Sequence, residues 1–404
     1  MWNDFRPISL CSFFNKLISK ILATRLIEIL PRIISVNQTG FVKGRIIFDN
    51  ILLVQEMTHD INSKGKGGNI IYKLDISKAY DNLNWNFLYK ILSLFGFCNV
   101  FIQLIKNSIE NCFFSVIING GQHGFFNSSQ GLRQGDPLSP ALFIIAMDYI
   151  SRGMEELYKR HKSLYFHTKG GFPVSHLCFA DDFIIFSNTS INNVKTMNHF
   201  LMEFQNMSGL EINKNKSNFL ISKDVSQDKI NYIKRICGFS FLSLPIKYLG
   251  TPIFKGRKRN HIFEEIISVF QKKIYNWHSK FLSFGGRLVL IKSVLNSIPI
   301  YIFHTLNPTA SICLRMERLI NKFFWGAKMN SSCICWSSSK KVCGTLNEGA
   351  LDCKSFLDMV KAFSYKLWFS FRANDSLWSK FMHAKYCKDR SEICCTYKTS
   401  DSPV

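Results

Sequence analysis

The sequence predicts an α+β protein built from more than one compact domain. Its 404 residues are 47% hydrophobic and 20% charged, which supplies apolar material for several cores and excludes a disordered chain or a coiled rod. Short strand-like runs alternate with segments whose apolar residues recur near the helical period of 3.6 residues. At this length we expect two or three domains.

The first sixty residues are predicted to be helical after a short extended start at 5–10. Apolar residues recur at helical spacing over 16–30, and Pro31 is expected to end that helix because proline removes a backbone donor. A glycine-rich turn at 64–68 leads into a strand over 69–74, which stops at Asp75. A carboxylate at the end of a buried strand is the first candidate for a functional group.

Two further helices have start signals. Asn84 can cap a helix, because its side chain can accept a hydrogen bond from a first-turn amide. A second helix is predicted to begin at Asp136 and Pro137, since the fixed φ of proline suits a first helical turn. The apolar positions predicted to face the core are Trp85, Leu88, Tyr89 and Leu92 in the first helix and Leu142, Ile145, Ala146 and Tyr149 in the second.

A hairpin with two acids at its tip is predicted further along the chain. The apolar runs 176–180 and 183–187 are separated only by Asp181 and Asp182. From Phe254 onward the pattern is helical and basic, with a break at Gly285 and Gly286. Beyond Trp325 the pattern weakens into a tail with scattered cysteines.

The charge predicts a polyanionic partner. The chain has 51 Lys and Arg against 28 Asp and Glu, a formal net charge of +23. Residues 1–255 hold 28 basic and 18 acidic groups, and residues 256–404 hold 23 and 10, so the excess is concentrated in the shorter part. Each Lys or Arg placed on a phosphate releases a condensed counterion. The alternative is a basic surface that only interacts with solvent.

The thirteen cysteines, an odd number without framework spacing, predict reduced thiols and an intracellular protein that is not secreted. No paired Cys-x-x-Cys knuckles occur, so we expect no structural zinc. The uncharged stretch 91–105 is too short to cross a membrane, and 293–314 is interrupted by Asn, His and Pro, so we expect no membrane partner.

Acids flanked by large apolar residues need a compensating cation. Two unit charges about 4 Å apart repel by roughly 4 kcal/mol at an effective dielectric near 20. Carboxylate oxygens select Mg²⁺ or Mn²⁺, and magnesium accepts substrate phosphates as further ligands. If Asp75 lies beside Asp181 and Asp182, the cluster suits two-metal phosphoryl transfer. Taken alone, the Asp-Asp pair is also compatible with a surface turn.

Several motifs together resemble the ordered motifs of reverse transcriptases. Their residues resemble those of non-LTR, LINE-type retrotransposons, and of plant elements in particular. The resemblance covers about residues 5–330, with the motifs in the family's order. The three central motifs are YKLDISKAYD at 72–81, GLRQGDPLSP at 131–140 and FADD at 179–182. The others are RPISL at 6–10, QTGFVKGR at 38–45, GLEIN at 209–213 and YLGTP at 248–252.

This resemblance implies a right-hand polymerase with fingers, palm and thumb. Residues 1–254 would form the reverse transcriptase domain, with partial fingers over 1–68 and a palm with an antiparallel sheet over 69–254. Residues 255–329 would form a helical thumb, and 330–404 a connector of unknown role. The 13 basic and 3 acidic residues of 255–328 suit a thumb that grips nucleic acid backbones, although a purely structural appendage fits too.

The resemblance also implies roles for single residues. Asp75, Asp181 and Asp182 would be catalytic, and these three with the Ile76 carbonyl would hold metal. Tyr80 would exclude a ribose 2′-hydroxyl, although a core aromatic is the alternative. Arg6 would reach the triphosphate, or else form a surface ion pair, and Lys216 is either a proton donor to pyrophosphate or a solvated lysine. The remaining implied residues are Arg45, Gln134 and Gly135 for nucleotide binding and Tyr248, Leu249 and Gly250 for the primer grip.

The expected activity is RNA-directed DNA synthesis with Mg²⁺ as the cofactor. Mn²⁺ is the alternative ion. The expected partners are an RNA template, a DNA primer or target DNA, and deoxynucleoside triphosphates, and an integrating element would act in the nucleus. The upstream fingers hairpin and endonuclease of the family have no counterpart here, so we expect a fragment of a larger element. The alternatives are a catalytically inactive nucleic-acid-binding remnant and, more distantly, a metal-dependent nuclease.

Overall fold

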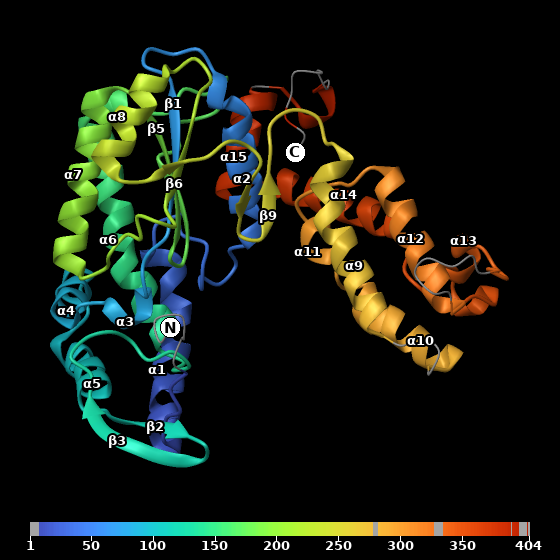
Figure 1. Cartoon of the computed structure of the whole chain (residues 1–404). Coiled ribbons are helices and arrows are strands. Elements are labelled where there is room, and N and C mark those ends of the chain that lie inside the picture. The colour runs from blue at the N-terminus through green and yellow to red at the C-terminus, as the bar shows by residue number, and fades with distance from the viewer. Residues whose placement is uncertain (1–7, 278–281, 327–333, 389, 396–401, 403–404) are drawn as a thin grey trace. The chain divides into compact units, whose positions relative to one another are not determined.

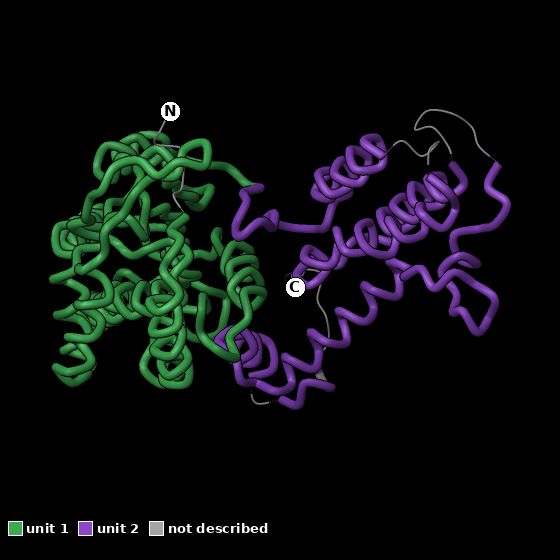
Figure 2. Tube along the Cα trace, turned by 90° about the horizontal axis from the view of Figure 1, so that it is seen from below, with its two compact units in different colours: residues 1–244 green, residues 245–404 purple. Residues whose placement is uncertain are grey.

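The computed structural model describes residues 8–277, 282–326, 334–388, 390–395 and 402 (Figure 1). The chain divides into two compact units, Met1–Leu244 and Pro245–Val404, which Figure 2 colours separately. Each unit buries its own hydrophobic core. The functional division predicted after residue 254 stays a prediction.

The first unit is built around a five-stranded sheet in the order β4-β5-β1-β6-β7. Every pair is antiparallel except β6 with β7. The central strand β1 is buried along its length apart from Lys73, because helices cover both of its faces (Figure 1). One face is covered by α6 (Ser139–Arg160), α7 (Ile191–Ser208) and α8 (Gln227–Cys237), and the other by α2 (Ile47–His59). The strands are β1 (Asn69–Leu74), β4 (His176–Phe179), β5 (Asp182–Asn188), β6 (Asn218–Ile221) and β7 (Ser240–Phe241).

The helices of the first unit supply most of its core. The longest, α6, is buried on all sides from Ala141 to Asp148, because it passes through the centre of the unit. The predicted Asn84 cap is confirmed, since its side chain accepts a hydrogen bond from the Phe87 amide at 3.2 Å. The helices are α1 (Phe13–Ile33), α2 (Ile47–His59), α3 (Ala79–Asn82), α4 (Trp85–Leu94), α5 (Asn99–Glu110), α6 (Ser139–Arg160), α7 (Ile191–Ser208) and α8 (Gln227–Cys237).

Two predicted helix boundaries were wrong. Pro31 does not end α1, which continues to Ile33, because a proline in the last turn removes a single hydrogen bond. The helix predicted at Asp136 begins instead at Ser139, with Pro140 in its first turn. Asp136 precedes the helix in a turn, where its carboxylate accepts a hydrogen bond from the Leu138 amide at 2.9 Å.

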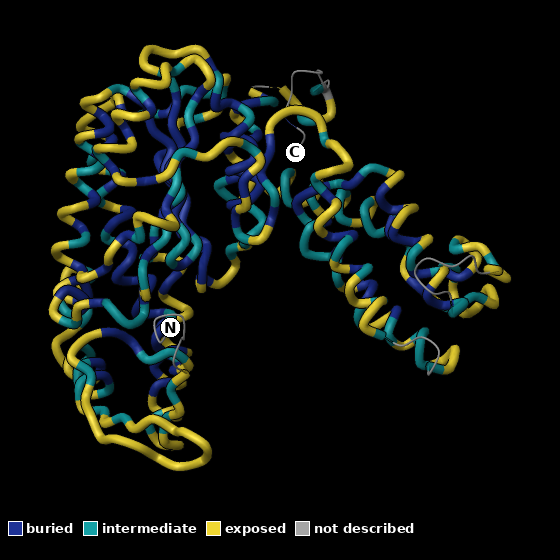
Figure 3. The backbone as a smooth tube through the Cα atoms, in the orientation of Figure 1, coloured by how far each residue is buried: buried dark blue, intermediate teal, exposed yellow. Residues whose placement is uncertain are grey.

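A second hairpin, β2 (Phe113–Ile118) with β3 (Gly121–Asn127), was not predicted. Its two strands are exposed over nearly their whole length, as the yellow tube in Figure 3 shows. The sequence does hold a signal for it, because Asn119-Gly120 is a favoured turn pair and both residues have positive φ, 49° and 82°. The sequence of the first strand, FFSVII, does not alternate between apolar and polar residues, so it gave no strand pattern from which to predict pairing.

The second unit is mainly helical. Its core includes edge-to-face contacts of Phe356 with Phe270 and with Phe303 at 5.8 and 6.1 Å between ring centroids. Its elements are the hairpin β8 (Ile246–Tyr248) and β9 (Thr251–Ile253) and the helices α9 (Glu264–Asn276), α10 (Phe284–Leu290), α11 (Ile300–Phe303), α12 (Ala310–Phe324), α13 (Ser339–Val342), α14 (Phe356–Ala373) and α15 (Leu377–Met382).

The tail beyond Trp325 is more regular than its sequence suggested. It contains α14, a helix of 18 residues, of which only Phe356 is buried. Its apolar residues Phe356, Val360 and Phe363 do recur at helical spacing and pack in or against the core of the second unit, so the sequence held a signal that the prediction did not use. Among the described residues, no helix has both the length and the apolar character needed to cross a bilayer.

Candidate active site

The predicted acids lie at one end of the central sheet. Strand β1 pairs with β5 so that Leu74 faces Phe183, which brings Asp75 to the end of the sheet where the β4–β5 hairpin turns. Phe179 pairs with Asp182, so Ala180 and Asp181 form a two-residue turn. Asp75 and Asp181 therefore lie at the same end of the sheet, next to the ends of the neighbouring strands β1 and β5.

The hairpin turn is held by a residue far away in sequence. Ala180 has a φ of 53°, a left-handed conformation that costs an alanine roughly 1–2 kcal/mol. The Gln38 side chain accepts hydrogen bonds from the Ala180 and Gly40 amides at 2.9 and 2.8 Å and donates to the Ala180 carbonyl at 3.3 Å. A Cβ on Gly40 would lie 2.5 Å from the Ala180 nitrogen, so the close approach requires glycine.

The chain after β1 is fixed by the segment at 211–217. The Asp75 amide donates to Ser217 Oγ at 3.0 Å, and the Asp75 carbonyl accepts from the Asn213 amide at 2.8 Å. Ile76 and Ile212 form an antiparallel bridge whose flanking hydrogen bonds are made by the residues on either side. The Ile76 carbonyl therefore points away from Ile212 and is not used by this pairing.

A cavity of about 980 Å³ opens at this edge of the first unit. Seven predicted site residues line it: Asp75, Ile76, Tyr80, Gln134, Gly135, Asp181 and Lys216. Asp182, the first residue of β5, is not among the lining residues, although it is half-buried beside Asp181. Lys216 is exposed at the rim, where its amide donates to Asn213 Oδ1 at 3.2 Å.

The loop that carries Gln134 and Gly135 is tied to the chain around Tyr80. The Leu132 amide donates to the Tyr80 carbonyl at 2.6 Å, and Gln134 Nε2 donates to Asp81 Oδ1 at 3.1 Å. Gly131 has a φ of 86°, and a Cβ there would lie 2.4 Å from the Asp81 carbonyl oxygen. This loop therefore fixes one wall of the cavity through close backbone contact.

A buried ion pair closes the same loop. Arg133 Nη2 lies 2.5 Å from Asp136 Oδ2, with side-chain exposures of 10% and 3%. Ser19 Oγ on α1 donates to the same carboxylate oxygen at 3.2 Å. Removing one partner of such a pair would leave an uncompensated buried charge, so the loop conformation depends on both residues.

Tyr80 packs in the core and also faces the cavity. Its ring stacks on Phe143 of α6, with centroids 4.8 Å apart and planes at 18°, and it also lines the cavity. Burial, and secondarily the charge of Asp181, raise the pKa of Tyr80 to about 12. The hydroxyl is therefore neutral at physiological pH, and the negative charge of Asp181 acts on it.

Arg45 has a different environment. Its guanidinium donates to the backbone carbonyls of Ile34 and Gln38 at 2.8 and 2.6 Å and to that of Ser35, all after the end of α1. Burial lowers the pKa of Arg45. Arg45 does not line the cavity, and its nucleotide-binding role stays a prediction. Arg6 lies outside the described residues.

The predicted primer grip lies in the second unit, in the turn between β8 and β9. Leu249 and Gly250 both have positive φ, 44° and 76°, as a two-residue hairpin requires. The Leu249 carbonyl accepts a hydrogen bond from the Tyr301 hydroxyl at 2.5 Å, and Tyr248 is fully buried. This anchored turn is rigid, but its contact with a primer stays a prediction.

The donors at the cavity fit a hard divalent cation. Within the described ranges, no three or more His, Cys, Asp or Glu side chains gather as a preformed metal site. The cavity nevertheless holds the carboxylates of Asp75 and Asp181 and the carbonyl of Ile76, all oxygen donors. Such ligands suit Mg²⁺ or Mn²⁺, which take their remaining ligands from water and phosphate.

Sequence reasoning missed several lining residues, of which Asp81, Arg133 and Asp136 are the most informative. All three lie inside the quoted motifs, and opposite charges three positions apart in a glycine loop were the available signal for the Arg133–Asp136 pair. The role of Gln38 in holding the acidic turn left no local signal, because its partner is 142 positions away. Glu211 and Asn213 also line the cavity.

Known proteins share sequence with more than half of this chain. The sequence family described as reverse transcriptase (RNA-dependent DNA polymerase) matches residues 2–253. An uncharacterized 149 kDa protein of transposon TX1 from Xenopus laevis is 26% identical over 330 residues, 80% of this chain and 24% of that protein. The Pol polyprotein of retrotransposable element R2DM from Drosophila melanogaster is 30% identical over 217 residues, 53% of this chain and 19% of that protein.

The chain thus spans about a quarter or less of the length of these two relatives. Among solved structures, apo telomerase from Candida tropicalis matches with a TM-score of 0.44 and 13% identity, over 91% of this chain and 61% of that one.

Proposed function

We propose, since this chain belongs to the reverse transcriptase (RNA-dependent DNA polymerase) family, that it adds deoxynucleotides to a primer 3′-hydroxyl under the direction of an RNA template. Its relatives include Pol proteins of non-LTR elements, so the reaction would serve such a retrotransposon. The α+β right-hand polymerase predicted from the sequence is the fold of this family. The observation that carries the proposal is the cavity that Asp75 and Asp181 share with Tyr80 and Gln134.

Reverse transcriptases use divalent metal ions, and we infer Mg²⁺, with Mn²⁺ as a substitute, for this chain. Asp75 and Asp181 would hold it together with the Ile76 carbonyl, and Asp182 would add negative charge from the neighbouring position. When bound there, such an ion would supply activation of the attacking primer oxygen and stabilisation of the leaving pyrophosphate. The two carboxylates reach this position on separate strands, so their spacing is set by the sheet.

The other cavity residues would position the incoming nucleotide. The neutral Tyr80 ring, fixed by stacking on Phe143, would lie under the sugar and exclude a 2′-hydroxyl. Gln134, held by Asp81, and Gly135, which has no side chain, would allow the loop to approach the nucleotide closely. Lys216 at the rim would donate a proton to the departing pyrophosphate.

The inferred partners are an RNA template, a DNA primer or target DNA, and deoxynucleoside triphosphates. The excess of positive charge, +23 over the chain, supports nucleic acid partners because phosphate neutralisation releases counterions. An element that integrates would act on nuclear DNA, so we infer a nuclear site of action.

A primer-extension assay tests this proposal. The purified chain with an RNA template, an annealed DNA primer, Mg²⁺ and deoxynucleotides should extend the primer. Asp181→Asn should reduce extension by at least about 100-fold, since it removes a charge that the reaction requires, while affinity for the primer–template changes less than about twofold. Gel analysis of the products and a binding titration measure the two quantities.

Asp224→Asn provides the matched control, because Asp224 is an exposed carboxylate of the same unit that does not line the cavity. It should extend the primer like the unaltered chain. Equal extension by Asp181→Asn would refute the catalytic assignment. Binding without any extension by the unaltered chain would favour an inactive nucleic-acid-binding remnant.

A further inference from the structure

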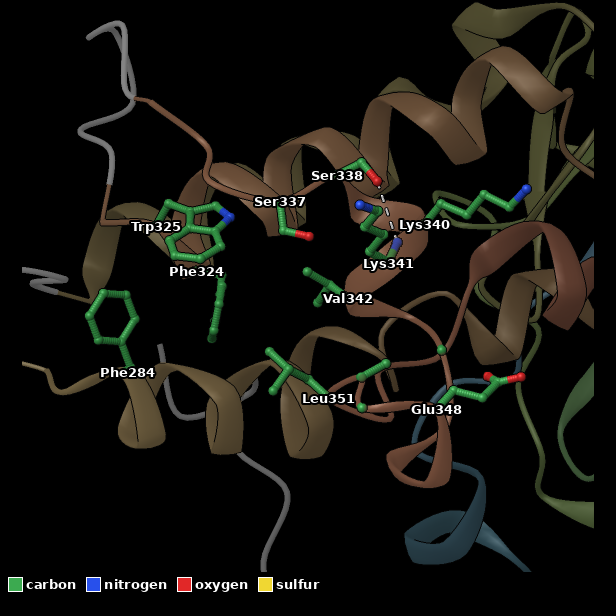
Figure 4. Close-up of a pocket in the computed structure, with 13 residues that line it drawn as sticks. Phe284, Phe324, Trp325, Ser337, Ser338, Lys340, Lys341, Val342, Glu348 and Leu351 are labelled. Atoms are coloured by element: carbon green, nitrogen blue, oxygen red, sulfur yellow. Dashed lines mark hydrogen bonds between the residues drawn. The ribbon is translucent and has the colours of Figure 1, made fainter.

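A second large cavity lies wholly within the second unit, outside every motif of the polymerase assignment. Its volume is about 960 Å³, in the upper part of the roughly 300–1,000 Å³ range of small-ligand sites. Figure 4 shows Trp325, Phe324 and Phe284 along one side, with Lys341 and Val342 opposite them. The cavity thus combines an aromatic wall with a cationic one.

The aromatic wall is built from two helices. Phe284 begins α10, and Phe324 and Trp325 end α12. The ring centroid of Phe284 lies 5.8 Å from that of Phe324 and 5.9 Å from that of Trp325. Phe324 is buried, whereas Phe284 is 55% exposed, so the wall presents an open ring beside a packed one.

A hydrogen bond holds the Trp325 ring, and Arg287 contacts the other two aromatic residues. Asn321 on α12 accepts from Trp325 Nε1 at 3.1 Å and donates to the Ser337 carbonyl, also at 3.1 Å, which links the indole to the opposite wall. Arg287 lies 4.9 Å from the Phe284 ring centroid and donates to the Phe324 carbonyl at 2.7 Å. The wall is therefore preorganised, so a ligand that stacks on it pays little ordering cost.

The cationic wall has little local compensation. Lys341 has no ion pair among the described residues, and in Figure 4 Lys340 extends away from the rings. The lining acid, Glu348, keeps its charge, but its carboxylate is held by hydrogen bonds from the Thr345 amide and hydroxyl at 3.1 Å each and in Figure 4 lies far from the rings. A ligand with a negative charge and a flat apolar ring matches both walls.

We propose that this cavity binds one unpaired nucleotide of a single-stranded nucleic acid, with its base against Phe284 and Trp325 and its phosphate near Lys341. Aromatic stacking accepts any base, and a nearby cation neutralises the backbone. RNA and DNA share this chemistry. A base within a duplex is already stacked on its neighbours, so paired strands do not fit. The site would let the second unit hold a strand independently of polymerisation.

The test is direct binding of short single strands to the full chain, without deoxynucleotides, so that it is decided separately from polymerase activity. RNA and DNA strands with one 2-aminopurine report stacking by loss of base fluorescence, and anisotropy reports affinity. Phe284→Ala should weaken single-strand binding about tenfold and restore the base fluorescence, with duplex affinity unchanged. Phe284→Trp should keep both affinity and quenching, because it retains a stacking surface.

Tyr365→Ala is the matched control, since Tyr365 is an aromatic residue of the same unit, 73% exposed, and outside the cavity. It should leave single-strand binding unchanged. Lys341→Gln should lower the slope of log affinity against log salt by about 0.7, the share of one phosphate. Phe284 is more exposed than buried, so its removal should preserve the thermal transition of the second unit.

Unchanged single-strand affinity in Phe284→Ala would overturn the proposal. So would an equal loss of duplex affinity, because the ring would then act only through folding. An absence of fluorescence quenching in the unaltered chain would also overturn it and would leave the cavity to an apolar peptide side chain. A response confined to RNA or to DNA strands supports the site and identifies the strand it prefers.

Discussion

The two compact units use their charge in different ways. The first, residues 1–244, has 26 basic and 18 acidic residues, a net of +8, and concentrates acids at one edge of its sheet. The second, residues 245–404, has 25 basic and 10 acidic residues, a net of +15, on a helical framework. We propose that function in the first unit depends on where single groups lie. In the second unit, we propose that it depends on the number of cations and on the aromatic rings of its cavity.

This difference explains why six of the seven short motifs lie in the first unit and only YLGTP, at 248–252, lies in the second. A cavity wall that leaves no room for a Cβ tolerates few residue types, as Gly131 beside the Asp81 carbonyl shows. A basic helical surface can exchange the position of one lysine for another. The predictions below test whether the units differ in this respect.

Gly131→Ala should have the largest effect, if close backbone contact determines the first unit. The new Cβ would lie 2.4 Å from the Asp81 oxygen on a backbone with φ of 86°. Strain and overpacking together should lower the free energy of unfolding of this unit by about 3 kcal/mol, and primer extension should fall with it. Denaturant titration and extension assays measure these changes.

Gly96→Ala isolates the contact from the backbone conformation. Gly96 has nearly the same φ, 85°, but open space around its Cβ position. We expect a loss of about 1 kcal/mol there. Equal losses at the two glycines would mean that the Gly131 loop adapts, and the claim that backbone proximity shapes the cavity would fail.

The second prediction concerns the charge of the second unit. Replacing Arg257, Lys258 and Arg259 together with alanine should lower the slope of log affinity against log salt for a primer–template by about 2, at roughly 0.7–0.9 per phosphate contact. The loss should be similar for unrelated sequences, because phosphate contacts carry no base information. Titrations over a salt series with two unrelated duplexes measure the slope.

A triple replacement in the first unit, Lys159, Arg160 and Lys162 with alanine, removes the same charge from the exposed end of α6. It should leave the slope nearly unchanged. If both triple variants lower the salt slope equally, the net charge of the whole chain determines affinity for the primer–template. The two units would then contribute to binding in the same way. An unchanged slope in the first triple variant would remove that cluster from the nucleic acid path.

Tyr80→Ala should change the choice of nucleotide. If the ring lies beneath the sugar, the ratio of kcat/KM for deoxynucleotides to that for ribonucleotides should fall about tenfold or more. Tyr80→Phe should keep the ratio, because it retains the ring that stacks on Phe143. A stability loss with an unchanged ratio in Tyr80→Ala would assign Tyr80 to core packing alone.

His176 provides the smallest effect at neutral pH, because its influence on the stability of the first unit appears only in acid. Burial lowers the pKa of His176 to about 3, whereas an unfolded histidine titrates near 6.5. The unfolded chain therefore takes up a proton that the folded chain does not. Stability should be complete above about pH 6.5 and fall by about 1.4 kcal/mol per pH unit below it, down to about pH 3.

Denaturation series at several pH values check this, with His161→Gln as the exposed control. His176→Gln should lose the titration between pH 6.5 and about 3, and His161→Gln should keep it. A pH dependence that persists in His176→Gln would assign the acid sensitivity to other groups.

The features that could be predicted from the sequence are those that depend on residues close together in the chain. The strand over 69–74, the Asn84 cap and the hairpin around Asp181 were all predictable, because each depends on neighbours in sequence. The start of α6 was misplaced, since Asp136 is taken by Arg133 and Ser19 and does not cap that helix. The helix α14 was missed although its apolar residues recur at helical spacing. Contacts between distant segments left no local pattern.

The bond between Gln38 and Ala180 has a consequence for the order in which the first unit folds. The left-handed turn that carries Asp181 is unfavourable for an isolated hairpin, and the amide that stabilises it belongs to a segment 142 residues earlier. Closing so long a loop is slow, because its entropy must be spent before the contact is gained. During synthesis the Gln38 side chain therefore cannot bind the turn until residue 180 has left the ribosome. We expect the acidic turn to reach its final shape late, after the helices have formed.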